Sequence, residues 1–159
     1  MIRSLHVLPM LPYPPRTGGH LRAWNLCNRL SSRLDQTVLC RVMTPPPPEH
    51  VAPFAERHVK LHTVTIPRPR RAIKMLKGLR FLCSPYPVMV AGWDFRVMRQ
   101  RLKSLLATDA FDIVVLDGTP LCSYMPLLRG SRALKVAHWY DLEAEFLFRK
   151  ARMMPPGSH

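Results

Sequence analysis

Short apolar runs alternate along this chain with stretches in which apolar residues recur at helical intervals. Five runs are either continuously apolar or strictly alternating, which predicts strands at residues 5–10, 37–43, 59–66, 111–117 and 134–139. The helical recurrence predicts helices at residues 20–34, 51–57, 70–83, 93–107, 121–128 and 142–153. Strands that alternate with helices favour an α/β fold, a Rossmann-like parallel sheet flanked by helices.

Prolines end several of these elements. The first strand runs into "PMLPYPP" at residues 9–15, which predicts a stiff loop because proline fixes φ and has no N–H to donate. Four consecutive prolines at residues 45–48 follow the second strand and are predicted to be extended and solvated.

The helix predicted at residues 70–83 is basic on one side and apolar on the other. Its cations Arg70, Arg71, Lys74 and Lys77 share one arc of a helical wheel, and the apolar residues occupy much of the opposite side. Two interpretations are open: the helix lies on an anionic membrane surface, or its apolar side covers the sheet while its charges are solvated.

Length and composition indicate one folded unit. With 159 residues and 47% hydrophobic content, the chain can bury one core, so we expect one domain at residues 1–153 and a tail at 154–159. No stretch approaches the roughly 20 apolar residues of a membrane span, and we expect a cytoplasmic protein. The cysteines, at positions 27, 40, 83 and 122, lack C-x-x-C spacing, so we expect free thiols, no disulfide framework and no metal.

Charge is the strongest compositional signal. The chain has 24 Lys and Arg against 10 Asp and Glu, a formal net charge of +14. A surface of that sign attracts phosphate groups on nucleotides, nucleic acids or anionic lipids. No helix-turn-helix, zinc or RNA-platform signature is present, which disfavours nucleic acid as the partner. A basic α/β module that binds anionic membrane or nucleic acid without catalysis remains the alternative to an enzyme.

Candidate binding residues gather where the first predicted helix begins. Gly18 and Gly19 precede helical N–H groups that have no intrahelical partner, so a phosphate or sugar can approach them. His20 and Arg22 follow in the first turn, and Asp117 ends a strand at the same edge of the predicted sheet. The other interpretation is that the two glycines only make a turn, and G-x-G-x-x-G is absent.

Candidate catalytic residues follow the last predicted strand. His138, Asp141 and Glu143 place an imidazole and two carboxylates at one strand end, where proton transfer or hydroxyl binding is feasible. The alternative is a helix start, with Asp141 as N-cap and Glu143 in the first turn.

Three segments resemble a known family. "LPYPPRTGGHLRAWNL" (residues 11–26), "FDIVVLDGTPLCSYMPLLR" (111–129) and "KVAHWYDLEAEFLFRKAR" (135–152), in this order, resemble the amino-terminal domain of family 4 glycosyltransferases of the GT-B fold. The first segment is the most specific, and it is similar to bacterial sugar transferases that begin with a strand and a PYPP-x-x-GG loop.

The resemblance implies sugar transfer from a nucleotide sugar with retention of anomeric configuration and without a metal ion or other cofactor. Gly18 and Gly19 match the loop that approaches the donor diphosphate and sugar, and Arg22 matches the arginine of that motif. The acidic segment that begins at Tyr140 matches the acceptor side of the cleft. The implied partners are a nucleotide sugar, a glycan or lipid-linked acceptor for envelope or exopolysaccharide synthesis, and an anionic membrane surface at the inner face of the cytoplasmic membrane.

Two departures from the family pattern stand out. Family members often carry His directly before the Asp/Asn-x-Glu segment, where this chain has Tyr140 and carries His138 two residues earlier. A GT-B enzyme also needs a second Rossmann-like domain with a Glu-x7-Glu donor site, and residues 153–159 do not supply it. We therefore expect an incomplete amino-terminal half of a GT-B glycosyltransferase that is inactive alone.

Overall fold

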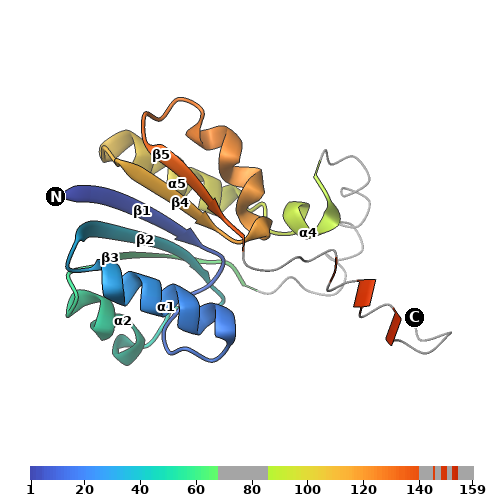
Figure 1. The fold of residues 1–159 in the computed structure, drawn as a ribbon, viewed down its shortest axis with the longest axis horizontal. Coiled ribbons are helices and arrows are strands. Elements are labelled where there is room, and N and C mark those ends of the chain that lie inside the picture. Colours follow the sequence, from blue (N-terminus) through green and yellow to red (C-terminus); the bar gives the residue numbers. More distant parts are fainter. Residues whose placement is uncertain (68–85, 140–144, 146–147, 150–151, 154–159) are drawn as a thin grey trace.

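A five-stranded, all-parallel sheet forms the centre of the molecule. The computed structural model describes residues 1–67, 86–139, 145, 148–149 and 152–153 (Figure 1). The strand order is β3-β2-β1-β4-β5, with bounds β1 Ile2–Leu8, β2 Leu34–Val42, β3 Lys60–Thr65, β4 Ile113–Asp117 and β5 Leu134–His138. The predicted α/β fold with a parallel, Rossmann-like sheet is confirmed.

Helices cover both faces of this sheet. Their bounds are α1 Gly18–Leu30, α2 Pro48–Ala55, α4 Val88–Ala91, α5 Arg96–Thr108 and the 3₁₀ helix η1 Thr119–Leu128. Figure 1 shows α1 and α2 on one side of the strands and α5 on the other. This is the arrangement expected when β1 and β2 lead into helices on one face and the chain then crosses to begin β4 on the far side of β1.

Two apolar cores result from this layering. The core under α5 and η1 includes Leu39, Leu102 and Tyr124, all fully buried, and the core under α1 and α2 includes Trp24 and Phe54. In the second core the Trp24 ring meets the Phe54 ring edge-on at 5.1 Å. Alternate strand residues supply the two cores because successive side chains of a strand point to opposite faces.

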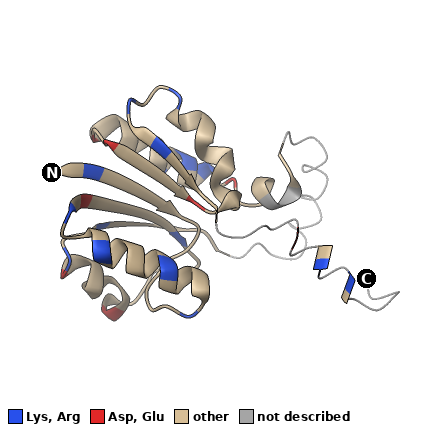
Figure 2. Cartoon of the chain, viewed as in Figure 1, with Lys and Arg blue, Asp and Glu red and all other residues tan. Residues whose placement is uncertain are grey.

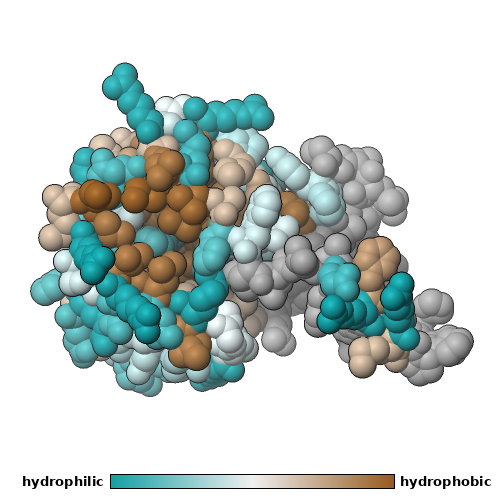
Figure 3. All heavy atoms as spheres, viewed as in Figure 1, coloured by the Kyte–Doolittle hydropathy of each residue, from teal (hydrophilic) through white to brown (hydrophobic). Residues whose placement is uncertain are grey.

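The half of the sheet beside α1 remains partly uncovered. In the view of Figure 3, apolar surface gathers above α1 over β1 and β4. Leu21 on α1 is 50% exposed and Leu134 on β5 is 62% exposed. Leu134 is the first residue of β5, so this surface extends toward the edge of the sheet at which the strands begin.

Two predicted boundaries are wrong for local reasons. The helix predicted at 20–34 ends at Leu30, where a turn bonds the Arg33 N–H to the Leu30 carbonyl at 2.9 Å and Leu34 starts β2. The proline run predicted to be entirely extended instead begins α2 at Pro48. Proline is well suited to the first helical position because the N–H that it lacks would have no intrahelical partner there.

The segment after β4 is a 3₁₀ helix rather than a regular helix. Gly118 precedes it with φ of 103°, a conformation that favours glycine, and Pro120 and Pro126 each lack a backbone N–H. The short helix α4 was not predicted.

Two predicted helices fall largely outside the described residues. The basic helix at 70–83, with Arg70, Arg71, Lys74 and Lys77, lies wholly outside them. Of the helix at 142–153 the structure describes residues 145, 148–149 and 152–153, all helical. Across the described part of the chain, no helix combines the length and the apolar character that crossing a bilayer requires.

Candidate functional site

A cavity of about 280 Å³ opens at the carboxyl edge of the sheet between β1 and β4. This is the switch point of a 3-2-1-4-5 sheet, where the chain leaves β1 toward one face and β4 toward the other, and where open α/β sheets bind ligands. The cavity is lined by Leu8, Pro9, Met10, Pro12, Thr17, Gly19, His20, Ala23 and Asp117.

The start of α1 forms one wall of this cavity. Thr17 caps the helix, because its hydroxyl accepts the His20 N–H at 3.3 Å. The first helical bond runs from the Leu21 N–H to the Thr17 carbonyl at 2.9 Å, so the N–H groups of Gly18 and Gly19 precede it. A methyl group added at Gly18 would meet no atom within 4 Å. The fold therefore does not require glycine at position 18 for space, and the helix end remains open to a ligand.

Three polar side chains meet beside the cavity. Arg22 on α1 donates through Nη2 to the Asp117 Oδ1 at 2.6 Å and through Nη1 to the His138 Nδ1 at 2.7 Å. The Asp117 side chain is only 4% exposed, whereas those of Arg22 and His138 are 28% and 38% exposed. A guanidinium has no acceptor atom, so the His138 Nδ1 is the acceptor in this contact, and the same nitrogen lies 3.4 Å from the Asp117 Oδ1. We call Arg22, Asp117 and His138 the polar cluster.

Strand pairing brings these residues together. Asp117 and His138 are opposite partners at the ends of β4 and β5, and the Gly118 N–H donates to the His138 carbonyl at 2.8 Å. Arg22, the fifth residue of α1, completes the cluster. The prediction that Asp117, His138 and the start of this helix share one edge of the sheet is confirmed.

Burial sets the charge of two nearby histidines. His6 on β1 is 2% exposed, and its pKa is lowered from 6.5 because burial disfavours the imidazolium, although the Asp117 carboxylate opposes that shift. The pKa of His20 is also lowered, first by burial and then by the positive charge of Arg16. Both rings are therefore neutral at pH 7, so His20 offers hydrogen-bonding atoms to the cavity rather than a charge.

The predicted site residues divide between two neighbouring spaces. Gly19, His20 and Asp117 line the cavity described above. Gly18, Arg22 and His138 line an adjoining open groove of about 440 Å³ along α1. The candidate catalytic residues Asp141 and Glu143, together with Tyr140, lie outside the described residues.

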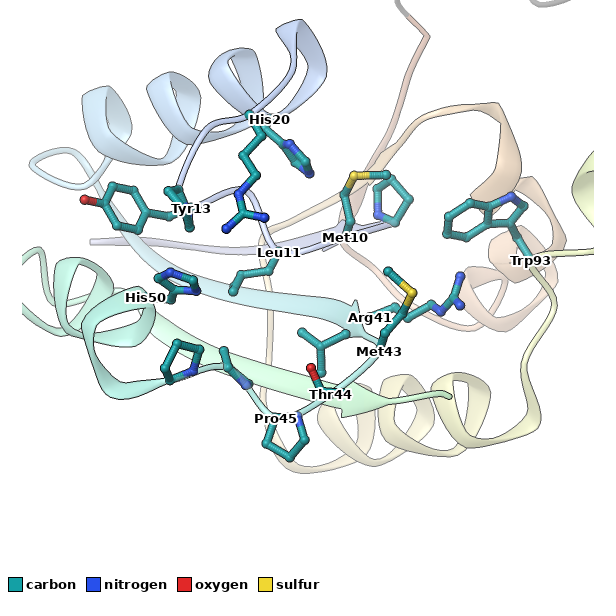
Figure 4. Close-up of a pocket in the computed structure, with 16 residues that line it drawn as sticks. Met10, Leu11, Tyr13, His20, Arg41, Met43, Thr44, Pro45, His50 and Trp93 are labelled. Atoms are coloured by element: carbon teal, nitrogen blue, oxygen red, sulfur yellow. The ribbon is translucent and has the colours of Figure 1, made fainter. Parts of the chain in front are cut away.

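A second cleft of about 430 Å³ was missed by the sequence reasoning. It lies between the loop after β1 and the proline segment after β2, with Trp93 at one end (Figure 4). Its polar side chains include four basic ones, Arg16, His20, Arg41 and His50, and the hydroxyl-bearing Tyr13 and Thr44. Two proline-rich segments that follow neighbouring parallel strands were the available signal, because both must lie at the same sheet edge.

The described side chains give the site a defined chemistry. Neutral imidazole, helix N–H groups and a cation matched by a buried carboxylate can hold an anion or sugar hydroxyls and stabilise charge on a leaving phosphate. Among residues 1–67 and 86–139 and the few described beyond them, no three His, Cys, Asp or Glu side chains gather as metal ligands would.

Fold and site together define an α/β protein with a Rossmann-like parallel sheet and a polar cluster at its switch point. Comparison of the chain with protein-family models, with curated proteins and with solved structures gives no match.

Proposed function

We propose that this chain is the acceptor-side domain of a retaining GT-B glycosyltransferase. It transfers a sugar from a nucleotide sugar to a glycan or lipid-linked acceptor, together with a second domain that binds the nucleotide. The observation that carries the proposal is the open start of α1, where Gly19 lines a cavity at the switch point of the sheet and Gly18 lines the groove along the helix. The resemblance in residues 11–26 assigns the donor diphosphate and sugar to these same glycines.

The chemistry of the cavity wall suits this reaction. Departure of a nucleoside diphosphate develops negative charge on phosphate oxygens, and preorganised N–H groups at the positive end of a helix stabilise it. His20 presents a neutral ring next to those groups, so it can hydrogen bond a sugar hydroxyl without adding charge.

Arg22 has a more restricted role than a direct phosphate clamp. Its guanidinium is held by the Asp117 carboxylate and the His138 ring, so part of its charge is already compensated. In the proposed site Arg22 orients these two residues and strengthens the positive potential near α1, while the N–H groups of Gly18 and Gly19 contact the diphosphate.

A matched pair of glycine variants tests the diphosphate site. The chain is titrated with uridine, guanosine or adenosine diphosphate while the amide resonances of Gly18 and Gly19 are followed by NMR. Gly18→Ala should weaken binding about tenfold by occupying ligand space. Gly130→Ala is the control, because Gly130 also has no atom within 4 Å of an added methyl and lines neither the cavity nor the groove along α1 that Gly18 lines. If both variants bind the nucleoside diphosphate equally well, the proposal that these glycines form the binding site is wrong.

Transfer itself is measured in extracts of the cells that make this protein. Extracts with the gene intact and with the gene deleted are supplied with radiolabelled UDP-, GDP- and ADP-sugars and with membrane lipids or soluble glycans. We expect deletion to abolish transfer from one of these nucleotide sugars, and the intact gene to restore it. Unchanged transfer from all of them would overturn the proposal.

The high net charge favours a second candidate, binding to an anionic surface without catalysis. Figure 2 shows Lys and Arg on both helical layers and at the sheet edges, more often than Asp and Glu. This candidate predicts equal affinity of the wild type and Gly18→Ala for anionic vesicles, with affinity that falls steeply as salt rises, and it predicts no response of the Gly18 amide to a nucleoside diphosphate.

A further inference from the structure

The cleft between the loops after β1 and β2 has mostly apolar walls. Figure 4 shows Met10 and Leu11 on one side and Met43 and Pro45 on the other, with Trp93 beyond them. Its volume of about 430 Å³ falls within the range of about 300–1,000 Å³ typical of small-molecule sites. Binding of an apolar ligand to such walls is favourable because it removes apolar surface from water.

Most polar side chains of this cleft are basic. Arg16, Arg41, His20 and His50 line it, and its described lining residues include no Asp or Glu. The Arg41 guanidinium lies 5.1 Å from the centre of the Trp93 ring and 4.8 Å from that of Phe95. Stacking of this kind holds the guanidinium in place at the cleft wall. Arg16 is exposed and lines the cleft, and the pKa of His20 is lowered first by burial and then by the charge of Arg16.

The cleft is continuous with the cavity at the start of α1. Pro9, Met10 and His20 line both spaces. A ligand in the cleft therefore borders the cavity that contains Gly19, and the two spaces meet at His20. Two ligands can meet at this residue, one anionic at the helix end and one apolar in the cleft.

We propose that this cleft binds a phosphate ester of an alkyl or prenyl chain, with the chain against the methionines and prolines and the phosphate between Arg16 and Arg41. Apolar walls alone would bind any apolar molecule, and cations alone would bind inorganic phosphate. The combination therefore selects a ligand that carries both a hydrocarbon chain and a phosphate. That the cleft holds a lipid-linked acceptor, rather than an unrelated lipid phosphate, rests on the proposed function.

Calorimetry with decyl phosphate, kept below its micelle concentration, tests the site. Decanol lacks the anion and inorganic phosphate lacks the chain, so each should bind at least about tenfold more weakly than decyl phosphate. If decanol binds as tightly as decyl phosphate, the proposed role of the cations is refuted. If inorganic phosphate binds as tightly, the proposed role of the apolar walls is refuted.

Two pairs of variants locate the ligand. Met43→Glu puts a carboxylate into the cleft and should reduce affinity for decyl phosphate more than about tenfold. Val97→Glu is its control, because Val97 is 55% exposed against 49% for Met43 and does not line the cleft. Arg16→Gln should weaken binding about tenfold, whereas Arg129→Gln, also exposed, should not. Equal effects within either pair would overturn the assignment to this cleft.

The same variants separate this inference from the proposed function. Met43→Glu should leave the affinity for uridine diphosphate within about twofold, because Met43 does not line the cavity at α1. Vesicles of phosphatidylcholine and phosphatidic acid distinguish a soluble ligand from a surface. Wild type that binds these vesicles and ignores decyl phosphate would overturn the cleft assignment, even if the diphosphate site is correct.

Discussion

Replacing Asp117 by Asn removes the carboxylate at the centre of the polar cluster. The substitution keeps the shape of the side chain and one oxygen that can accept the Arg22 bond, now 2.6 Å long. It leaves the Arg22 guanidinium beside a neutral amide, with the His138 ring as its other partner. The side chain of Asp117 is 4% exposed, so little water can replace the lost charge.

The expected loss of stability follows from how far each partner is buried. Breaking a buried ion pair by removing one charge costs about 3–5 kcal/mol, and one hydrogen bond to a charged group contributes about 1.5–3 kcal/mol. Because Arg22 is 28% exposed and the oxygen of the new amide would still accept a bond, we expect a loss of about 2–3 kcal/mol for Asp117→Asn. With a urea m-value of about 2 kcal/mol/M, the unfolding midpoint falls by about 1–1.5 M.

The assay is urea unfolding followed by circular dichroism, with Asp35→Asn as the control. Asp35 pairs with Lys60 at 3.1 Å, but these side chains are 31% and 63% exposed, so its loss should be less than about 1 kcal/mol. A double-mutant cycle with Arg22→Gln isolates the interaction between Arg22 and Asp117. If Asp117→Asn costs no more than Asp35→Asn, the reasoning from burial is refuted.

Three further predictions concern buried groups. Tyr124→Phe removes a hydroxyl that accepts a backbone N–H at 3.0 Å and donates to a carbonyl at 2.6 Å, so chemical unfolding should show a loss of about 1–3 kcal/mol. Burial lowers the pKa of His6 below 6.5, so the neutral ring stabilises the folded state fully above pH 6.5. This stabilisation is lost as the pH falls from 6.5 toward the pKa in the folded state. His6→Gln should therefore flatten the pH dependence of the free energy of unfolding, measured by urea titration between about pH 7.5 and 5.5. Burial raises the pKa of Cys27 and of Cys40 to about 12, so a thiol reagent at about pH 8 should label them only after unfolding, and rapid labelling of the native chain would contradict their burial.

Much of the fold could be predicted from hydrophobic periodicity, because a strand buried on both faces leaves a nearly continuous apolar run. "IVVLD" in β4 is such a run, and its terminal acid was correctly placed at the carboxyl edge. The ends of the helices were harder to predict from the sequence. The helix that begins at Gly18 ends at Leu30, although Leu34 continues the helical spacing, because pairing with β1 gives Leu34 a better position in β2.

The candidate site was predictable in its members but not in its contacts. Parallel topology alone brings Asp117, His138 and the start of α1 to one edge, and that much follows from the order of strands and helices. Which atoms meet depends on side-chain reach across β1 and on register, and neither is visible in the sequence. Arg22 therefore looked like a cation available for phosphate, although it is bonded to Asp117 and His138.

The ion pairs made by the acidic residues also affect where the positive charge of this chain, +14 in total, is left uncompensated. Among the described residues Asp35, Glu56, Asp94, Asp117 and Glu145 each lie within ion-pair distance of a cation. An acid used in this way neutralises a cation locally and adds nothing to the field at the surface. The excess cations thus belong mainly to the solvent-facing layer, as Arg16 does beside the cleft. A field of that kind concentrates anionic ligands around the whole molecule, whereas the apolar walls and the open start of α1 decide where such a ligand is held.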